Sequence, residues 1–107
     1  MQDITFLGDS LGAIREFPDN IKQDAGYELH KVQCGENPSD FKPMKTVGSG
    51  VVEIRLKDAA GIYRMIYTAK IGDTIYVLHA FQKKTQKTSQ HDIELAKTRY
   101  KKLLQEL

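Results

Sequence analysis

The fold is decided by residues 51–88, VVEIRLKDAAGIYRMIYTAKIGDTIYVLHAFQKKTQKT. From Val51 onward apolar residues alternate with charged ones, the pattern of a β-strand with one buried face. Turn residues at 58–61 and 72–73 then divide this run from two further apolar runs. The pattern predicts three consecutive antiparallel strands. The middle strand, over residues 62–69, is apolar on both faces, as expected of a central strand.

The two turns also predict which side chains share a face of this sheet. If the strands pair up to the edges of both turns, Arg55 lies opposite Arg64, and Arg64 lies opposite Phe81. His79 falls on the same face, because positions on one face recur every second residue. A slip of one residue in either turn would break this grouping.

The charged groups on this face have both a structural and a functional interpretation. Buried guanidinium groups are costly unless they are paired, and Glu53 is the candidate partner of Arg55 or Arg64 in a structural ion pair. His79 lies in an apolar strand, where a histidine is either a hydrogen-bonded core residue or a catalytic one. The functional interpretation is that cations, an imidazole and an aromatic ring together suit a phosphodiester ligand.

Helical patterns precede the three strands. Ser10 is predicted to cap a short helix, and a second helix is predicted to end near Cys34 with Gly35 as its stop. Together these helices would form a hairpin that covers one face of the sheet. A short extra strand over residues 1–7 would be the fourth, and residues 36–50 are expected to form a connecting loop.

A final helix is predicted to start at Ser89, with Asp92 near a capping-box position. The expected fold class is therefore α+β. It consists of an N-terminal helical hairpin, a three- to four-stranded antiparallel sheet and a C-terminal helix.

The composition bounds the kind of protein. The 107 residues are 40% hydrophobic and 28% charged, which fits one globular domain over residues 1–107. No apolar run approaches the ~20 residues needed to cross a bilayer, and residues 1–4 lack the order of a secretory signal. The single Cys34 cannot form an internal disulfide and fits a reducing compartment. We therefore expect a cytoplasmic protein without membrane contact.

The absence of several known motifs excludes further classes of protein. Neither His30 nor His91 has metal-ligand spacing with Cys34, so no metal site is expected. There is no glycine-rich phosphate loop, nucleophile elbow or paired-carboxylate signature.

Charge is unevenly divided along the chain. Residues 1–63 carry 7 basic and 10 acidic side chains, whereas residues 64–107 carry 9 basic and 4 acidic ones. A basic half of this kind indicates a polyanionic partner, since clustered lysine and arginine attract phosphates and release counterions. The alternative is that a basic helix simply offsets an acidic one.

The chain resembles a known family along most of its length. The matching segments are residues 50–55 (GVVEIR), Tyr63-Arg64 with Tyr67, residues 76–85 (YVLHAFQKKT), Phe17-Pro18, residues 26–29, Gln33-x-Gly35-x-x-Pro38, Lys42-Pro43, and Ala96 with Arg99. In these it resembles the phage-derived Gp49-like family, in the HigB branch of the RelE/ParE toxin superfamily.

The resemblance implies the toxin of a type II toxin–antitoxin pair. RelE-like members cleave mRNA in the ribosomal A site without a metal or other cofactor. In that reaction the 2′-hydroxyl attacks the adjacent phosphate and leaves a cyclic phosphate and a 5′-hydroxyl. The implied partners are mRNA on the ribosome and a small helix-turn-helix antitoxin protein.

The resemblance also implies roles for particular residues. Arg64 matches the arginine that contacts the scissile phosphate, and Arg55 matches the second of two basic residues on the preceding strand. Lys84, or its neighbour Lys83, matches the basic residue that helps the leaving group or the phosphate. The RNA-binding surface is expected to include Lys83, Lys87, Phe81 and Lys57.

Two positions depart from the family pattern. Glu53 stands where the first of the paired basic residues is expected, so the general base is either Glu53 or His79. A late tyrosine that stacks on the substrate base has no clear equivalent, since Gln90 and His91 occupy that region. Two alternatives therefore stay open: a ParE-like toxin that poisons DNA gyrase, and an inactive basic module that binds RNA or the antitoxin.

Overall fold

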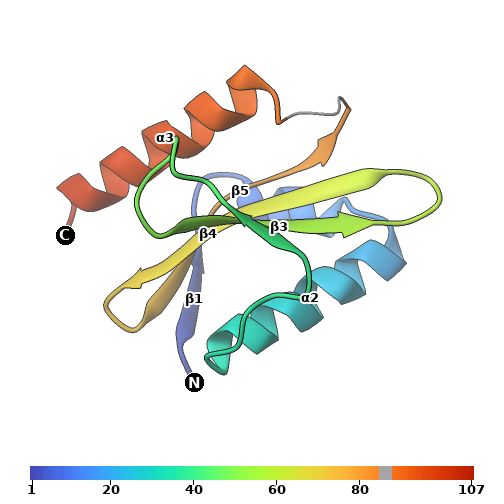
Figure 1. Ribbon diagram of the computed structural model, residues 1–107, viewed down its shortest axis with the longest axis horizontal. Helices are drawn as coiled ribbons and strands as arrows, with labels where there is room; N and C mark the ends of the chain where they lie inside the picture. Colours follow the sequence, from blue (N-terminus) through green and yellow to red (C-terminus); the bar gives the residue numbers. More distant parts are fainter. Residues whose placement is uncertain (85–87) are drawn as a thin grey trace.

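A computed structural model describes residues 1–84 and 88–107 and shows helices on both faces of one sheet (Figure 1). The elements in chain order are β1 (Asp3–Phe6), α1 (Ser10–Arg15), α2 (Asp19–Gln33), β2 (Phe41–Pro43), β3 (Val51–Lys57), β4 (Ile62–Ile71), β5 (Thr74–Lys83) and α3 (Gln90–Gln105). The sheet order is β1-β5-β4-β3-β2. The α+β class with a C-terminal helix is confirmed.

The number and direction of the strands differ from the expectation. The described sheet has five strands rather than three to four, and β1 pairs with β5 in parallel, so it is not wholly antiparallel. The extra strand is β2, which lies in the segment expected to be only a loop. At three residues it is too short to show an alternating pattern, and its Pro43 is tolerated because β2 is an edge strand.

The predicted register of the long strands is confirmed. Arg55 pairs with Arg64, Arg64 pairs with Phe81, and the two turns close as expected. Between these points the β4–β5 register shifts by one residue, so that Tyr67 pairs with Val77, and it shifts back before the second turn. The second shift reverses the first, so the pairs near both turns keep the predicted register and the predicted side chains still share one face.

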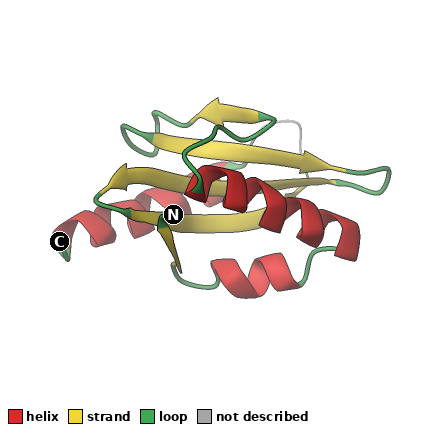
Figure 2. Ribbon diagram, turned by 90° about the horizontal axis from the view of Figure 1, so that it is seen from below, coloured by secondary structure: helices red, strands yellow, loops and turns green. Residues whose placement is uncertain are grey.

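Helices lie on both faces of the sheet (Figure 2), and each face has a core of its own. On one face α1 and α2 pack against the strands through a cluster that includes Ile21, Ala25 and Met65. On the other face α3 packs through Ala96 and Leu103. The helical hairpin thus covers one face as predicted, which leaves the predicted polar face on the same side as α3.

The ends of the helices test the capping predictions. Ser10 is not the N-cap of α1: Asp9 holds that position, and the buried Ser10 hydroxyl donates to the Val77 carbonyl at 3.2 Å. The Ser10 hydroxyl therefore satisfies the backbone carbonyl of Val77 on β5 and does not accept a hydrogen bond from the first N–H groups of α1. Ser89 does cap α3, since its Oγ accepts from the Asp92 N–H at 3.1 Å.

Among residues 1–84 and 88–107, no helix is both long enough and apolar enough to cross a bilayer.

Candidate functional site

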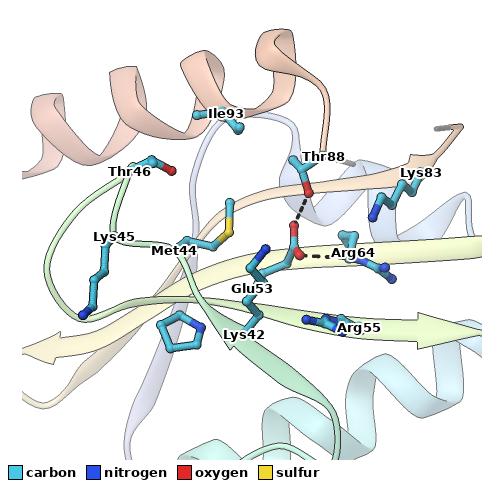
Figure 3. A pocket seen from close by; sticks show the side chains of 11 residues that line it. Lys42, Met44, Lys45, Thr46, Glu53, Arg55, Arg64, Lys83, Thr88 and Ile93 are labelled. Carbon is cyan, nitrogen blue, oxygen red and sulfur yellow. Dashed lines mark hydrogen bonds and ion pairs between the residues drawn. The ribbon is translucent and has the colours of Figure 1, made fainter. Parts of the chain in front are cut away.

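A cleft of about 760 Å³ opens on the α3 face of the sheet (Figure 3). Five of its lining residues are cationic and come from β2, the loop after it, β3, β4 and β5: Lys42, Lys45, Arg55, Arg64 and Lys83. The lining also includes the carboxylate of Glu53 and the hydroxyl of Thr88. The sheet register creates this cluster, because it aligns Arg55 with Arg64 on neighbouring strands.

The centre of the cleft is a buried ion pair between Arg64 and Glu53. Arg64 Nε lies 3.5 Å from Glu53 Oε1, and these residues are only 7% and 3% exposed. The other carboxylate oxygen of Glu53 accepts a hydrogen bond from Thr88 Oγ1 at 2.6 Å. Glu53 is therefore the partner of Arg64, one of the two possibilities left open by the sequence.

Arg64 is held by few hydrogen bonds. Its Nη1 donates to the Tyr63 carbonyl at 3.0 Å, while Nε has no hydrogen-bond partner within the described residues. A guanidinium carries five N–H donors in a fixed fork. Arg64 can therefore accommodate an anion with two oxygens without losing its backbone anchor.

Burial and mutual repulsion perturb the cations of the cleft. Burial lowers the pKa of Arg64, Glu53 opposes this effect, and the charge of Arg55 adds to it. Burial also lowers the pKa of Lys83, and the charge of Arg64 lowers it further. A bound anion would relieve this repulsion, so the cleft is electrostatically suited to a phosphate.

Arg55 is positioned by the residue that precedes β2. Its Nε lies 3.9 Å from Asp40 Oδ1, and its backbone N–H donates to the Asp40 carbonyl at 2.9 Å. Both side chains are more than a third exposed, so the ion pair orients Arg55 without adding much stability. Sequence reasoning missed Asp40 because the pairing of β2 with β3 was not predicted.

His79 lies on the predicted face but does not line the cleft. It is 6% exposed, its ring is stacked on Phe81 with centroids 4.9 Å apart, and its Nε2 is 2.7 Å from Asp92 Oδ1. Arg99 Nη1 approaches Nδ1 at 3.5 Å. The surroundings are those of a hydrogen-bonded core residue that joins β5 to the start of α3.

The other predicted RNA contacts are distributed around the cleft. Lys83 lines it, whereas the exposed Lys84 lines a smaller neighbouring hollow together with Phe81. Lys57 is exposed at the end of β3 and does not line the cleft. Lys87 lies outside the described residues.

Two lysines and a threonine that were not among the predicted site residues join the site. Lys42 and Lys45 lie in the segment expected to be a connecting loop, for which the sequence left two interpretations open, residues that line a site or ordinary loop residues. Lys42 lies in the site because it pairs with Glu53 on the neighbouring strand, β2 with β3. No sequence signal pointed to Thr88, whose contact with Glu53 spans 35 positions.

No group of three histidine, cysteine or acidic side chains within residues 1–84 and 88–107 has the geometry to hold a metal ion. The described cleft is instead lined by five cationic side chains and a single carboxylate.

The fold is similar to one seen in a bacterial toxin. The crystal structure of the isolated E. coli RelE toxin superposes with a TM-score of 0.60, over 99% of this chain and 98% of that chain. The two sequences are 12% identical, so this likeness concerns the fold. Residues 13–101 match the model of the family described as Phage derived protein Gp49-like. The chain belongs to that family, which confirms the resemblance found in the sequence. A search of curated protein sequences gives no match.

Proposed function

We propose that this protein is a HigB-type toxin of a type II toxin–antitoxin pair and that it cleaves mRNA in the ribosomal A site. Its family and its RelE-like fold support a toxin of this superfamily. The observation that carries the nuclease proposal is the convergence of five cations around one carboxylate in a single cleft.

The reaction needs cations because of how charge develops. The 2′-oxygen of the RNA forms a bond to the adjacent phosphorus, and the bond from phosphorus to the 5′-oxygen breaks. The products are a 2′,3′-cyclic phosphate and a 5′-hydroxyl. In the transition state negative charge accumulates on the phosphoryl oxygens, where preorganised positive groups are most effective.

Arg64 is the main phosphate ligand in this proposal. Its position is fixed before the substrate arrives, by the Tyr63 carbonyl and the Glu53 carboxylate. Arg55 lies opposite Arg64 on the neighbouring strand and is oriented by Asp40. The two guanidinium groups would bind the non-bridging oxygens without having to reorganise.

Lys83 is the proposed general acid, which donates a proton to the departing 5′-oxygen. It lines the cleft, and burial followed by the charge of Arg64 lowers its pKa. A lysine with a lowered pKa is a better proton donor near neutral pH. The neighbouring Lys84 is exposed and lines a different hollow, which favours Lys83 for this role.

Glu53 is the proposed general base, which accepts the proton of the 2′-hydroxyl. It lines the cleft, whereas Nε2 of His79 is engaged by Asp92. To accept this proton Glu53 must exchange its contact with Thr88 or Arg64 for one with the substrate. A carboxylate would thus serve where relatives are expected to use a basic residue.

The proposal includes partners beyond the RNA. A toxin of this type requires an antitoxin, and in this branch we expect a small helix-turn-helix protein. Action on translating ribosomes would place the protein in the cytoplasm.

The proposal is tested by induced expression followed by mapping of mRNA 5′ ends. Wild type should arrest growth and generate new 5′ ends within codons, and Arg64→Gln should do neither at equal protein level. Uncut transcripts accompanied by DNA damage would instead identify a gyrase poison. Normal growth with uncut transcripts and undamaged DNA would identify an inactive module.

A further inference from the structure

We infer that Lys42 and Lys45 form a second phosphate subsite, so that the cleft binds single-stranded RNA through at least two consecutive backbone phosphates. The inference rests on the proposed function, because it takes RNA as the ligand of the cleft. It adds the part of the site that would recognise RNA next to the scissile bond.

The two lysines come from other elements than the proposed catalytic cations, and Lys42 lies beside Glu53 whereas Lys45 lies further from Arg64 (Figure 3). Lys42 is on β2 and Lys45 is in the loop that follows, while Arg64 and Lys83 are on β4 and β5. In Figure 3 Lys45 lies on the far side of Glu53 from Arg64 and Lys83. A phosphate bound at Arg64 would therefore leave the Lys45 side of the cleft unoccupied.

Charge in the cleft exceeds what one phosphate can neutralise. Arg64 is paired with Glu53 and Arg55 with Asp40. Within residues 1–84 and 88–107, the other three cations that line the cleft, Lys42, Lys45 and Lys83, have no ion-pair partner. A single phosphodiester carries one negative charge, so one bound phosphate leaves two of these three lysines without a counter-charge.

The cations on the two sides influence one another. Burial and then Arg64 lower the pKa of Lys83, and the charge of Lys42 contributes in the same direction. Lys42 is therefore part of the same electrostatic field as Lys83. An RNA strand that spans the cleft would relieve the repulsion among these cations. One phosphate at Arg64 would relieve it only in part.

A lysine on an edge strand can also serve simply to prevent pairing between sheets of different molecules. In this sheet β2 has only three residues and ends at Pro43, features that already block the edge. That interpretation gives Lys45, which lies beyond the strand, no role. The phosphate subsite accounts for both lysines.

The test measures binding of 2′-O-methyl oligonucleotides, which lack the attacking hydroxyl and cannot be cleaved. A dinucleotide without terminal phosphates has one phosphate, and a tetranucleotide has three. Dissociation constants are measured at several salt concentrations for wild type, Lys42→Gln/Lys45→Gln and Arg64→Gln. The control is Lys101→Gln/Lys102→Gln, which removes equal charge from exposed positions of α3 outside the cleft.

For wild type, the slope of log affinity against log salt should be steeper for the tetranucleotide than for the dinucleotide. The expected increment is about 0.7 for each further phosphate that is neutralised. Lys42→Gln/Lys45→Gln should abolish the increment and weaken binding of the tetranucleotide more than that of the dinucleotide, whereas Arg64→Gln should weaken both ligands. The control double variant should behave as wild type, and far-UV circular dichroism should show all variants folded.

The subsite is refuted if wild type binds neither oligonucleotide, or gives both the same slope. It is also refuted if the control variant lowers the slope as much as Lys42→Gln/Lys45→Gln does. Because the ligands are not cleaved, these results are independent of the proposed reaction. An inactive enzyme with the predicted slopes would overturn the proposed nuclease function and retain the subsite.

Discussion

Removing the charge of Glu53 should destabilise the fold, since it leaves the guanidinium of Arg64 buried without its counter-charge. The substitution Glu53→Gln keeps the volume of the side chain, and the amide oxygen can still accept the hydrogen bond from Thr88. The change therefore isolates the charge of the ion pair from its packing. Glu94→Gln is the matched control, because Glu94 pairs with Lys97 at 3.8 Å on an exposed surface.

The magnitude follows from the separation and the burial of the pair. At the observed 3.5 Å between Arg64 Nε and Glu53 Oε1, opposite unit charges attract by about 5 kcal/mol at an effective dielectric constant of about 20. Part of this is offset, because an amide costs less to bury than a carboxylate. Breaking a buried pair typically costs about 3–5 kcal/mol, and the open cleft lowers our expectation to about 2–4 kcal/mol. The control should change stability by less than about 0.5 kcal/mol.

Urea denaturation followed by far-UV circular dichroism measures these differences, since the chain has no tryptophan for fluorescence. The double variant Glu53→Gln/Arg64→Gln completes a mutant cycle. Its destabilisation should be smaller than the sum of the two single effects by at least about 1.5 kcal/mol, because no unpaired buried charge remains. Additive effects, or a Glu53→Gln variant as stable as the Glu94→Gln control, would refute the central ion pair.

Two other properties follow from the structure. Gly26→Ala should stabilise the fold by about 0.5–1 kcal/mol, because a Cβ on α2 there meets no atom within 4 Å and alanine favours helix. Gly8→Ala should destabilise the fold, since φ at Gly8 is +55° and a Cβ there would lie 2.5 Å from Arg99 Cζ. Equal melting temperatures for Gly26→Ala and Gly8→Ala would contradict these opposite effects on stability. Cleavage should decline as pH rises through a value below the ordinary lysine pKa of 10.5, because the acid Lys83 must be protonated and its pKa is lowered. Lys83→Arg should lower the single-turnover cleavage rate and remove that decline, because a guanidinium keeps its proton over the measurable range, and an unchanged profile would remove Lys83 from proton transfer.

The sequence predicted the long strands well because both turns are explicit. Closing the pairing at those turns aligned Arg55 with Arg64 and Arg64 with Phe81, as observed. The compensating register shift inside β4 and β5 was not predictable, since it depends on packing rather than on turn residues. It left the predicted face intact because the register recovers before the second turn.

The remaining differences come from contacts between distant segments. The pattern of β1 indicates a strand but not its direction, which depends on where the chain returns to the sheet. The three residues of β2 carry no period, so Lys42 could not be placed opposite Glu53. The position of His79 beside Asp92 likewise depends on how α3 packs against β5.

The most direct test of the account is single-turnover cleavage of mRNA held in the A site of purified ribosomes. The wild-type protein should cut within the codon and leave a 2′,3′-cyclic phosphate and a 5′-hydroxyl, and a 2′-O-methyl group on the attacking nucleotide should abolish the cut. Arg64→Gln should lower the cleavage rate by at least about 100-fold, as expected when a transition-state cation is lost. Products with a 5′-phosphate, or unchanged cleavage of the 2′-O-methyl mRNA, would contradict the proposed reaction.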